Sequence, residues 1–300
     1  MKKKKIGLAL GGGGARGICQ IEFLKVLDEL VIKPDVISGT SIGAIIGAFY
    51  AAGSSGQEIN DILDKIDISK KKDHKDLLNS NKEGNKLEKF LDEKIAELKD
   101  YYQKFENIHK MVDFSFFNNT SILKGKGVVK FFEENLPVKT FEELNIPLKI
   151  VATDFWNQKQ VVFEKGDLIP AIRASISIPG VLEPVIIDKM VLVDGGITNN
   201  LPYDLIQDEC ELTIAIDVSG TRSIPKKIKA PNVFDSIMQS FEILQDSIIR
   251  YQMKINEPDI LIKPRLQDID ILEFHKANDI IESVVEDVEK FRTEMITYKS

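Results

Sequence analysis

The sequence is poor in the residue types that bind metals, relay protons through imidazole or cross-link chains. Its 300 residues include 2 cysteines, 3 histidines and 1 tryptophan. Cys19 and Cys210 lie far apart, and neither has a second cysteine nearby. This excludes a disulfide scaffold and gives no support to a metal site or a redox motif. The two cysteines fit a reducing cytoplasm.

Long hydrophobic runs are also lacking. Val36–Gln57 carries no charge, but half of its residues are Gly, Ser, Thr or Gln, and its apolar part, Ile42–Gly53, is too short. A membrane-spanning helix needs ~20 apolar residues. Lys2–Lys5 precede an apolar run that ends at Gly11, well below the ~7–15 residues of a signal-peptide core. We expect a cytoplasmic protein whose basic start allows peripheral contact with anionic lipid.

The composition is that of a soluble globular protein, with 43% hydrophobic and 29% charged residues. The net charge of −7 argues against general nucleic-acid binding. The distribution is uneven: 11 of 19 glycines fall between Gly7 and Gly56, whereas residues 70–106 carry 19 charges. This pattern indicates a buried, glycine-rich N-terminal part followed by a charged helical insertion, which leads into the aromatic segment Phe114–Phe117. That segment suits a lid, a lipid-facing edge or buried core.

Strands and helices are predicted to alternate. Apolar residues recur at helical spacing over 18–31 and after Ser41, and the tail from Asp268 to Tyr298 also indicates helix. The predicted strands are Ile6–Leu10, Val36–Ile37, Leu148–Ala152, Val161–Phe163, Val185–Ile187, Met190–Val193, Leu212–Val218 and Ile260–Lys263. Such an order, with apolar strands, favours an α/β fold with a mainly parallel sheet covered by helices.

A glycine-rich turn, Gly11–Gly17, joins the first predicted strand to a helix. Gly12, Gly14 and Gly17 satisfy the pattern G-x-G-x-x-G. Consecutive backbone N–H groups at a helix N-terminus stabilise negative charge. That charge can be the pyrophosphate of a nucleotide or the oxyanion of acyl transfer, and the turn alone does not distinguish them.

A second turn carries a serine between two glycines, Gly39 and Gly43. The sequence Gly39-Thr40-Ser41-Ile42-Gly43 is a G-x-S-x-G between a predicted strand and a helix. This is the context of a nucleophile elbow, in which a sharp turn projects the serine hydroxyl. The Ile42 N–H and the helix dipole favour negative charge nearby. The alternative interpretation is Ser41 as a helix N-cap.

Asp194-Gly195-Gly196 follows the predicted strand Met190–Val193. Such a sequence is usually a turn, but an aspartate at the carboxyl end of a buried strand lies where α/β proteins gather their sites. If Asp194 reaches Ser41, it can accept the hydroxyl proton.

The histidines do not support a triad. His275 follows Asp194, so Ser41, Asp194 and His275 have the chain order of an α/β-hydrolase triad. Its polar neighbours favour a surface position, as the lysines beside His74 and His109 do for those residues. A serine–aspartate dyad is the better hypothesis.

The three motifs, in this order, resemble the patatin-like phospholipase family. That family combines a glycine-rich oxyanion loop, a G-x-S-x-G serine and a D-G-[AG] aspartate. The resemblance covers about residues 6–207 and includes Arg173–Gly180 before the aspartate. One departure is Gly11, which replaces the acidic residue that some members place before the glycine triplet; the backbone donors should be unaffected.

The resemblance implies a three-layer fold with a central, mainly parallel sheet flanked by helices. The catalytic domain would span 6–207 with a helical insertion at about 70–125, and strands and a helical tail of 208–300 would pack on the same core. It implies hydrolysis of acyl esters of phospholipids or other lipids without a metal or other cofactor. Ser41 and Asp194 would be catalytic, and Gly12, Gly13 and Gly14 would form the oxyanion hole. The supporting residues would be Arg16, Gly17, Gly39, Gly43, Gly195 and Gly196.

Three other classes stay open. A Rossmann-type nucleotide-binding enzyme would use Gly12, Gly14 and Gly17, with Asp35 near the spacing expected for a ribose ligand, but it leaves the other two motifs unexplained. An acyltransferase would pass the acyl group from the serine to an acceptor other than water. A non-catalytic lipid-binding or scaffold module would not react with a fluorophosphonate at Ser41.

Overall fold

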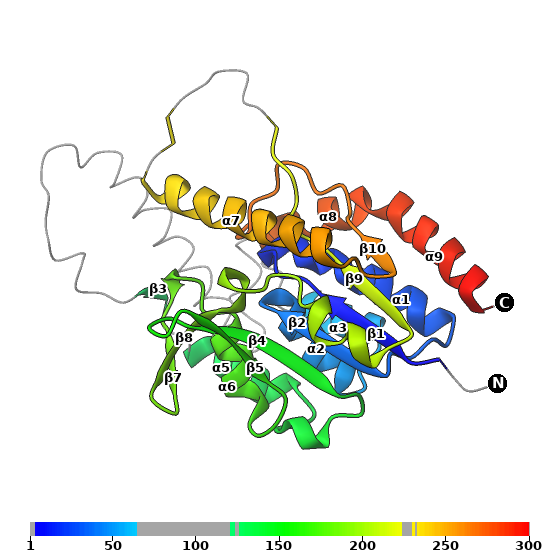
Figure 1. The fold of residues 1–300 in the computed structure, drawn as a ribbon, viewed down its shortest axis with the longest axis horizontal. Coiled ribbons are helices and arrows are strands. Elements are labelled where there is room, and N and C mark those ends of the chain that lie inside the picture. Colours follow the sequence, from blue (N-terminus) through cyan, green and yellow to red (C-terminus); the bar gives the residue numbers. More distant parts are fainter. Residues whose placement is uncertain (1–3, 65–120, 124–125, 224–229, 232, 300) are drawn as a thin grey trace, which may run out of the picture.

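The computed structural model describes residues 4–64, 121–123, 126–223, 230–231 and 233–299. Most of the predicted insertion at 70–125, with Phe114–Phe117, His74 and His109, lies outside the described residues. The described part has an eight-stranded sheet in the order β10-β9-β1-β2-β4-β8-β7, with β5 also paired to β4 (Figure 1).

The centre of the sheet is parallel. Its parallel strands are β10 (Ile260–Ile262), β9 (Leu212–Ile216), β1 (Ile6–Leu10), β2 (Val36–Thr40) and β4 (Leu148–Asp154). Antiparallel strands complete one side: β5 (Lys159–Phe163) and β8 (Met190–Asp194) on β4, and β7 (Val185–Ile187) on β8. A separate pair joins β3 (Ser121–Leu123) to β6 (Gly180–Leu182). The predicted α/β fold with a mainly parallel sheet is confirmed.

Helices cover both faces of the sheet (Figure 1). The larger core lies under α1 (Gln20–Glu29), α2 (Ile42–Ala51), α3 (Gly56–Asp64), α5 (Lys126–Asn135), α6 (Leu168–Ser175), α8 (Ala277–Ser283) and α9 (Val285–Lys299). The long helix α7 (Val233–Ile255) and the 3₁₀ turn η7 (Tyr203–Leu205) cover the other face. Alternation explains the two cores, because Leu8 and Leu10 point to the first and Ala9 to the second.

The tail differs from its prediction as one helix from Asp268. The structure has the 3₁₀ turn η9 (Phe274–Lys276) and then α8 and α9, and residues 268–273 are not helical. Asp268 has a positive φ of 57° and accepts hydrogen bonds from the Ser223 N–H and hydroxyl. The Glu273 carboxylate accepts from the Asp270 N–H. These side-chain bonds compete with helix formation and hold the segment as a turn.

Candidate active site

Two turns meet at the carboxyl edge of the parallel strands. β1 and β2 are paired in register, with Leu10 opposite Gly39, so the turns that follow them leave the sheet side by side. A Cβ added at Gly43 would lie 2.1 Å from the Leu10 carbonyl oxygen, and one at Gly17 would lie 2.2 Å from Ile42. Only glycine allows the two turns to pack this closely.

Ser41 adopts a backbone conformation that is rare for a residue with a side chain. Its φ is 54° and its ψ is −121°, between β2 and α2. Its N–H donates to the Ser175 hydroxyl over 2.9 Å, and its side chain makes no capping bond to α2. Ser41 therefore stands at the N-cap position of α2 without capping the helix through its hydroxyl. The strain is that of a sharp strand-to-helix elbow.

Strand β4 brings Asp194 to this elbow. Thr40 pairs with Val151, and Asp194 pairs with Ala152, the next residue of β4. Because β5 occupies the other edge of β4 at Val151 and Ala152, β2 and β8 share one edge and meet end to end. Ser41 and Asp194, far apart in the chain, are neighbours through this arrangement.

Asp194 is a buried carboxylate with an altered pKa. Its side chain is 1% exposed, and burial raises its pKa to about 6, while the Gly196 N–H and the Ser41 hydroxyl oppose the rise. The Gly196 N–H donates to Oδ1 over 2.7 Å. Oδ2 accepts no hydrogen bond from the described residues. The Ser41 hydroxyl thus lies close enough to the Asp194 carboxyl to lower its pKa as a hydrogen-bond donor would.

The N–H groups of the glycine turn are used unequally. Those of Gly11 and Gly12 donate to the carbonyl oxygens of Ile216 (3.0 Å) and Asn200 (2.9 Å). Those of Gly13 and Gly14 have no acceptor among the described residues. The turn therefore has two free donors next to the elbow, where the sequence predicted three, because the segment after Asp194 already uses the Gly12 N–H.

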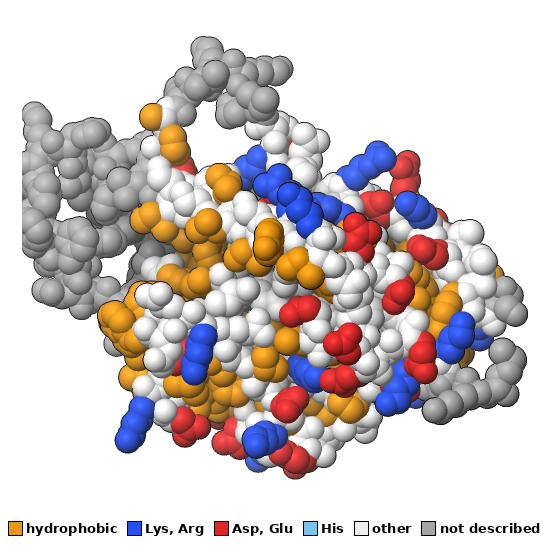
Figure 2. Space-filling model, in the orientation of Figure 1, with side chains coloured by type: hydrophobic (Ala, Val, Ile, Leu, Met, Phe, Trp, Pro, Cys, Tyr) orange, Lys and Arg blue, Asp and Glu red, His pale blue; other side chains and the backbone are white. Residues whose placement is uncertain are grey.

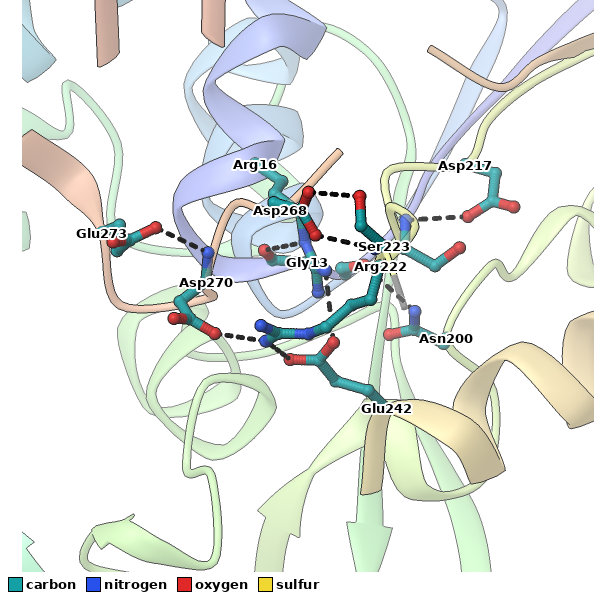
Figure 3. Close-up of polar contacts among 12 residues, drawn as sticks. Gly13, Arg16, Asn200, Asp217, Arg222, Ser223, Glu242, Asp268, Asp270 and Glu273 are labelled. Atoms are coloured by element: carbon teal, nitrogen blue, oxygen red, sulfur yellow. Dashed lines mark hydrogen bonds and ion pairs between the residues drawn. The ribbon is translucent and has the colours of Figure 1, made fainter. Parts of the chain in front are cut away.

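Arg16 links the glycine turn to α7 (Figure 3). It is 1% exposed, its Nε donates to the Gly13 carbonyl over 3.3 Å, and its Nη1 pairs with Glu242 of α7 over 3.3 Å. Glu242 also pairs with Arg222, which in turn pairs with Asp270. The network ties the glycine turn to α7 and to the chain around η9.

Several supporting residues were not singled out from the sequence. Ser175 holds the Ser41 N–H, and the Ser177 carbonyl accepts the Asp194 N–H over 2.9 Å. Arg173 donates to the Ser177 hydroxyl over 2.6 Å. All three lie in Arg173–Gly180, which the sequence had marked only as part of the resemblance. No sequence motif includes Asn200. Its position shortly after Asp194-Gly195-Gly196 is the one feature of the sequence that could have indicated a role in the site.

Asp35 lies at the opposite edge of the sheet from this site, and His275 is on the surface. Asp35 precedes β2, and its carboxylate accepts the N–H of Ile6 over 2.9 Å, at the amino end of β1. A ribose ligand in a Rossmann fold belongs at the carboxyl end instead, so the nucleotide-binding alternative loses its acidic residue. His275 is exposed in η9.

Two features are absent from the described residues. No group of three or more His, Cys, Asp or Glu side chains is arranged to hold a metal ion. No helix of this part combines the length and the apolar character that crossing a bilayer requires.

The protein is of the α/β class, with a serine elbow and a glycine turn side by side at the carboxyl edge of its sheet. The chain belongs to the patatin-like phospholipase family, whose model matches residues 8–206. The family is one of lipid ester hydrolases.

Similar chains come from bacteria and mammals. An NTE family protein of Mycobacterium tuberculosis is 32% identical over 230 residues, which are 76% of this chain and 53% of that protein. Patatin-like phospholipase domain-containing protein 7 of Rattus norvegicus is 31% identical over 218 residues, 72% of this chain and 14% of that protein. The chain thus spans about half the length of the mycobacterial relatives. Among solved structures, VipD from Legionella pneumophila aligns with a TM-score of 0.48 and 18% identity, over 97% of this chain and 67% of VipD.

Proposed function

We propose that the chain hydrolyses acyl esters of lipids, in the manner of a phospholipase A or lysophospholipase, with Ser41 as nucleophile and Asp194 as base. The observation that carries the proposal is the pairing on β4, where β2 ends at the serine elbow and β8 ends at the aspartate. A nucleophile beside a group that can take its proton is the minimum apparatus for covalent ester hydrolysis.

In the first step the Ser41 Oγ attacks the acyl carbonyl carbon while its proton passes to an Asp194 oxygen. Oδ2 suits this role because it accepts no hydrogen bond from the described residues. The carbonyl oxygen becomes an oxyanion that accepts hydrogen bonds from the Gly13 and Gly14 N–H groups, which are preorganised and free. The intermediate collapses to an acyl-serine, and the departing alcohol takes the proton from Asp194.

In the second step a water molecule gives its proton to Asp194 and attacks the acyl carbonyl. The same two N–H groups stabilise the second oxyanion. Collapse releases a fatty acid, and the proton returns from Asp194 to the Ser41 oxygen. The pKa of about 6 leaves most Asp194 side chains ionised at neutral pH, as a base requires.

Contact with a lipid surface is part of the proposal. Figure 2 shows apolar side chains over α7 and over β7, and exposed ones on these elements include Ile186, Ile237 and Leu244. The same α7 packs on η6 (Gly195–Ile197), directly after Asp194. An exposed apolar area beside the site suits an enzyme whose substrate arrives from a lipid surface.

The test is incubation of the chain with a mixed lipid extract, with products identified by mass spectrometry. Free fatty acid should appear with the unsubstituted chain and fall at least ~10³-fold with Ser41→Ala or Asp194→Asn. Ser247→Ala, which removes an exposed hydroxyl of α7 bonded to the Ile243 carbonyl, is the matched control and should retain activity. Full activity of Ser41→Ala would refute the assignment. Acylated acceptors in place of free fatty acid would indicate an acyltransferase.

A further inference from the structure

Three consecutive carbonyl groups of the glycine turn each accept a hydrogen bond from a side chain. Gln20 Nε2 donates to the Gly11 oxygen over 2.7 Å. Asn200 Nδ2 donates to the Gly12 oxygen over 3.0 Å, and Arg16 Nε to the Gly13 oxygen over 3.3 Å. The three side chains come from different parts of the fold, so the turn is held from several directions.

In a planar trans peptide the C=O of one residue and the N–H of the next point in opposite directions. A donor that fixes a carbonyl therefore also fixes the next N–H on the far side of the peptide. By this rule Gln20 orients the N–H of Gly12, Asn200 that of Gly13 and Arg16 that of Gly14.

The N–H groups of Gly12 and Gly13, oriented by the two side-chain amides, have different uses. The Gly12 N–H donates within the protein, to the Asn200 carbonyl. The Gly13 N–H has no acceptor among the described residues. The hydrogen bond from Gln20 thus orients an N–H group that is used inside the protein. The equivalent bond from Asn200 orients the Gly13 N–H, which is free to bind a ligand.

Asn200 is itself firmly held. It is 1% exposed, and its backbone oxygen and side-chain nitrogen both bond Gly12, over 2.9 and 3.0 Å. Its Oδ1 lies 2.4 Å from where a Cβ of Gly12 would be and 2.8 Å from that of Gly196. The amide must present its NH₂ to the Gly12 oxygen, because a flipped amide would set two acceptors against each other. Asn200 therefore connects the glycine turn to the turn after Asp194.

We propose that Asn200 is a positioning residue of the oxyanion hole, acting through the Gly12 carbonyl on the Gly13 N–H. The proposal rests on the proposed function. It assigns Asn200 no contact with the reacting atoms. It predicts a loss of transition-state stabilisation when the side-chain amide is removed, with substrate binding largely retained, because the oxyanion exists only after attack.

The test compares Asn200→Ala with Gln20→Ala in the full chain, on p-nitrophenyl butyrate. Each variant removes one buried amide donor from one glycine carbonyl. We expect kcat to fall about 10²-fold for Asn200→Ala with KM changed less than about threefold. For Gln20→Ala we expect kcat within about fivefold of the unsubstituted chain, since its peptide directs an N–H used internally. Thermal unfolding of both variants measures how much stability each substitution removes.

Equal kcat for the two alanine variants, or a loss at Asn200 that appears in KM alone, would overturn the proposal. Asn200→Leu keeps about the same side-chain size but has neither a donor nor a charge, so it should lose kcat as the alanine variant does, and it serves if the alanine variant does not fold. Ser41→Ala distinguishes a failure of the proposed function from a failure of the positioning role of Asn200. If it retains activity, the proposed function fails; if it abolishes activity while Asn200→Ala does not reduce kcat, only the positioning role fails.

Discussion

Ser41 and Asp194 both occupy states that cost stability. A non-glycine residue at φ 54° and ψ −121° is strained by roughly 1–3 kcal/mol. Burial also makes ionisation of Asp194 unfavourable, since its pKa rises from 3.8 to about 6. Strain and an altered pKa at adjacent residues are typical of sites kept for chemistry.

The pH dependence of activity follows from the Asp194 pKa. A base must be ionised, so kcat/KM for p-nitrophenyl butyrate should rise with pH through about 6 and then level off. Because no histidine takes part in the proposed dyad, the profile should keep this single rising limb when His275 is replaced by Gln. A profile that shifts in His275→Gln would contradict a two-residue apparatus.

Stability should respond to pH in the opposite sense. The folded state holds the Asp194 proton more tightly than the unfolded state, so this group's contribution is complete below about pH 4 and is lost as pH rises through about 6. Asp194→Asn removes the ionisation. Its unfolding free energy, relative to the unsubstituted chain, should therefore increase by about 1–3 kcal/mol between pH 4 and pH 8. Denaturant titrations at the two pH values measure this, and a pH-independent difference would disprove it.

At the residue scale the sequence predicted the proposed nucleophile and base, but not the residues that hold them in place by hydrogen bonds. Ser41 and Asp194 stood in short patterns with a physical meaning, a serine between glycines and an aspartate after an apolar strand. Asn200 and Ser175 act through hydrogen bonds to chain segments more than a hundred residues away. No local pattern encodes such contacts, and the use of the Gly12 N–H by Asn200 could not be predicted for the same reason.

Among the secondary-structure elements, α2 lies very close to the end of β1. A Cβ at Gly43 would meet the Leu10 carbonyl oxygen at 2.1 Å and its carbon at 2.6 Å, and backbone atoms cannot move aside singly. A Cβ at Gly47, one turn later, meets only side-chain carbons at 3.3 Å or more. The two glycines of this helix therefore have different roles.

Gly43→Ala should destabilise the chain by about 3 kcal/mol or more, because α2 must shift away from β1. Gly47→Ala should change stability by less than about 1 kcal/mol, since the gain in helix propensity offsets slight crowding. Thermal unfolding of the pair measures the difference. Equal effects would mean that α2 and the end of β1 are not in this close contact.

Element positions were predictable where hydrophobic runs were continuous. Val185–Ile187 has the predicted bounds, and β4 and β8 each extend only slightly past theirs. The tail was predicted less well, because its helical periodicity continues through 268–273, while side-chain bonds from Ser223 and Glu273 hold that segment as a turn. The spacing of apolar residues indicates which side chains are buried. It does not indicate where side chains form hydrogen bonds with backbone groups that a helix would otherwise use.

For the whole molecule, residues 208–300 are proposed to belong to the same folding unit as 6–207. β9 lies between β1 and β10, and α7 covers the second face of the sheet. A chain that ends after Gln207 would expose the edge of β1 that pairs with β9 and the face of the sheet that α7 covers, and we expect it to be insoluble or to lack a cooperative unfolding transition. A chain that ends after Val284 loses only α9, including the contact of Phe291 with Phe23 at 5.7 Å, and should fold with a lower Tm. A cooperative transition in the shorter chain would identify two independent domains.

The position of β1 has a consequence for synthesis on the ribosome. Its neighbour on one side, β2, follows within a few tens of residues, but its neighbour on the other side is β9, with Leu10 opposite Ile216. At roughly 5–20 residues per second, about 10–40 s separate the emergence of these two strands. During that interval the nascent chain carries an apolar strand with one unpaired edge, and the glycine turn that follows it lacks the Asn200 and Ile216 carbonyls that accept its first two N–H groups. The growing polypeptide is therefore most in need of chaperone protection until β9 has been translated.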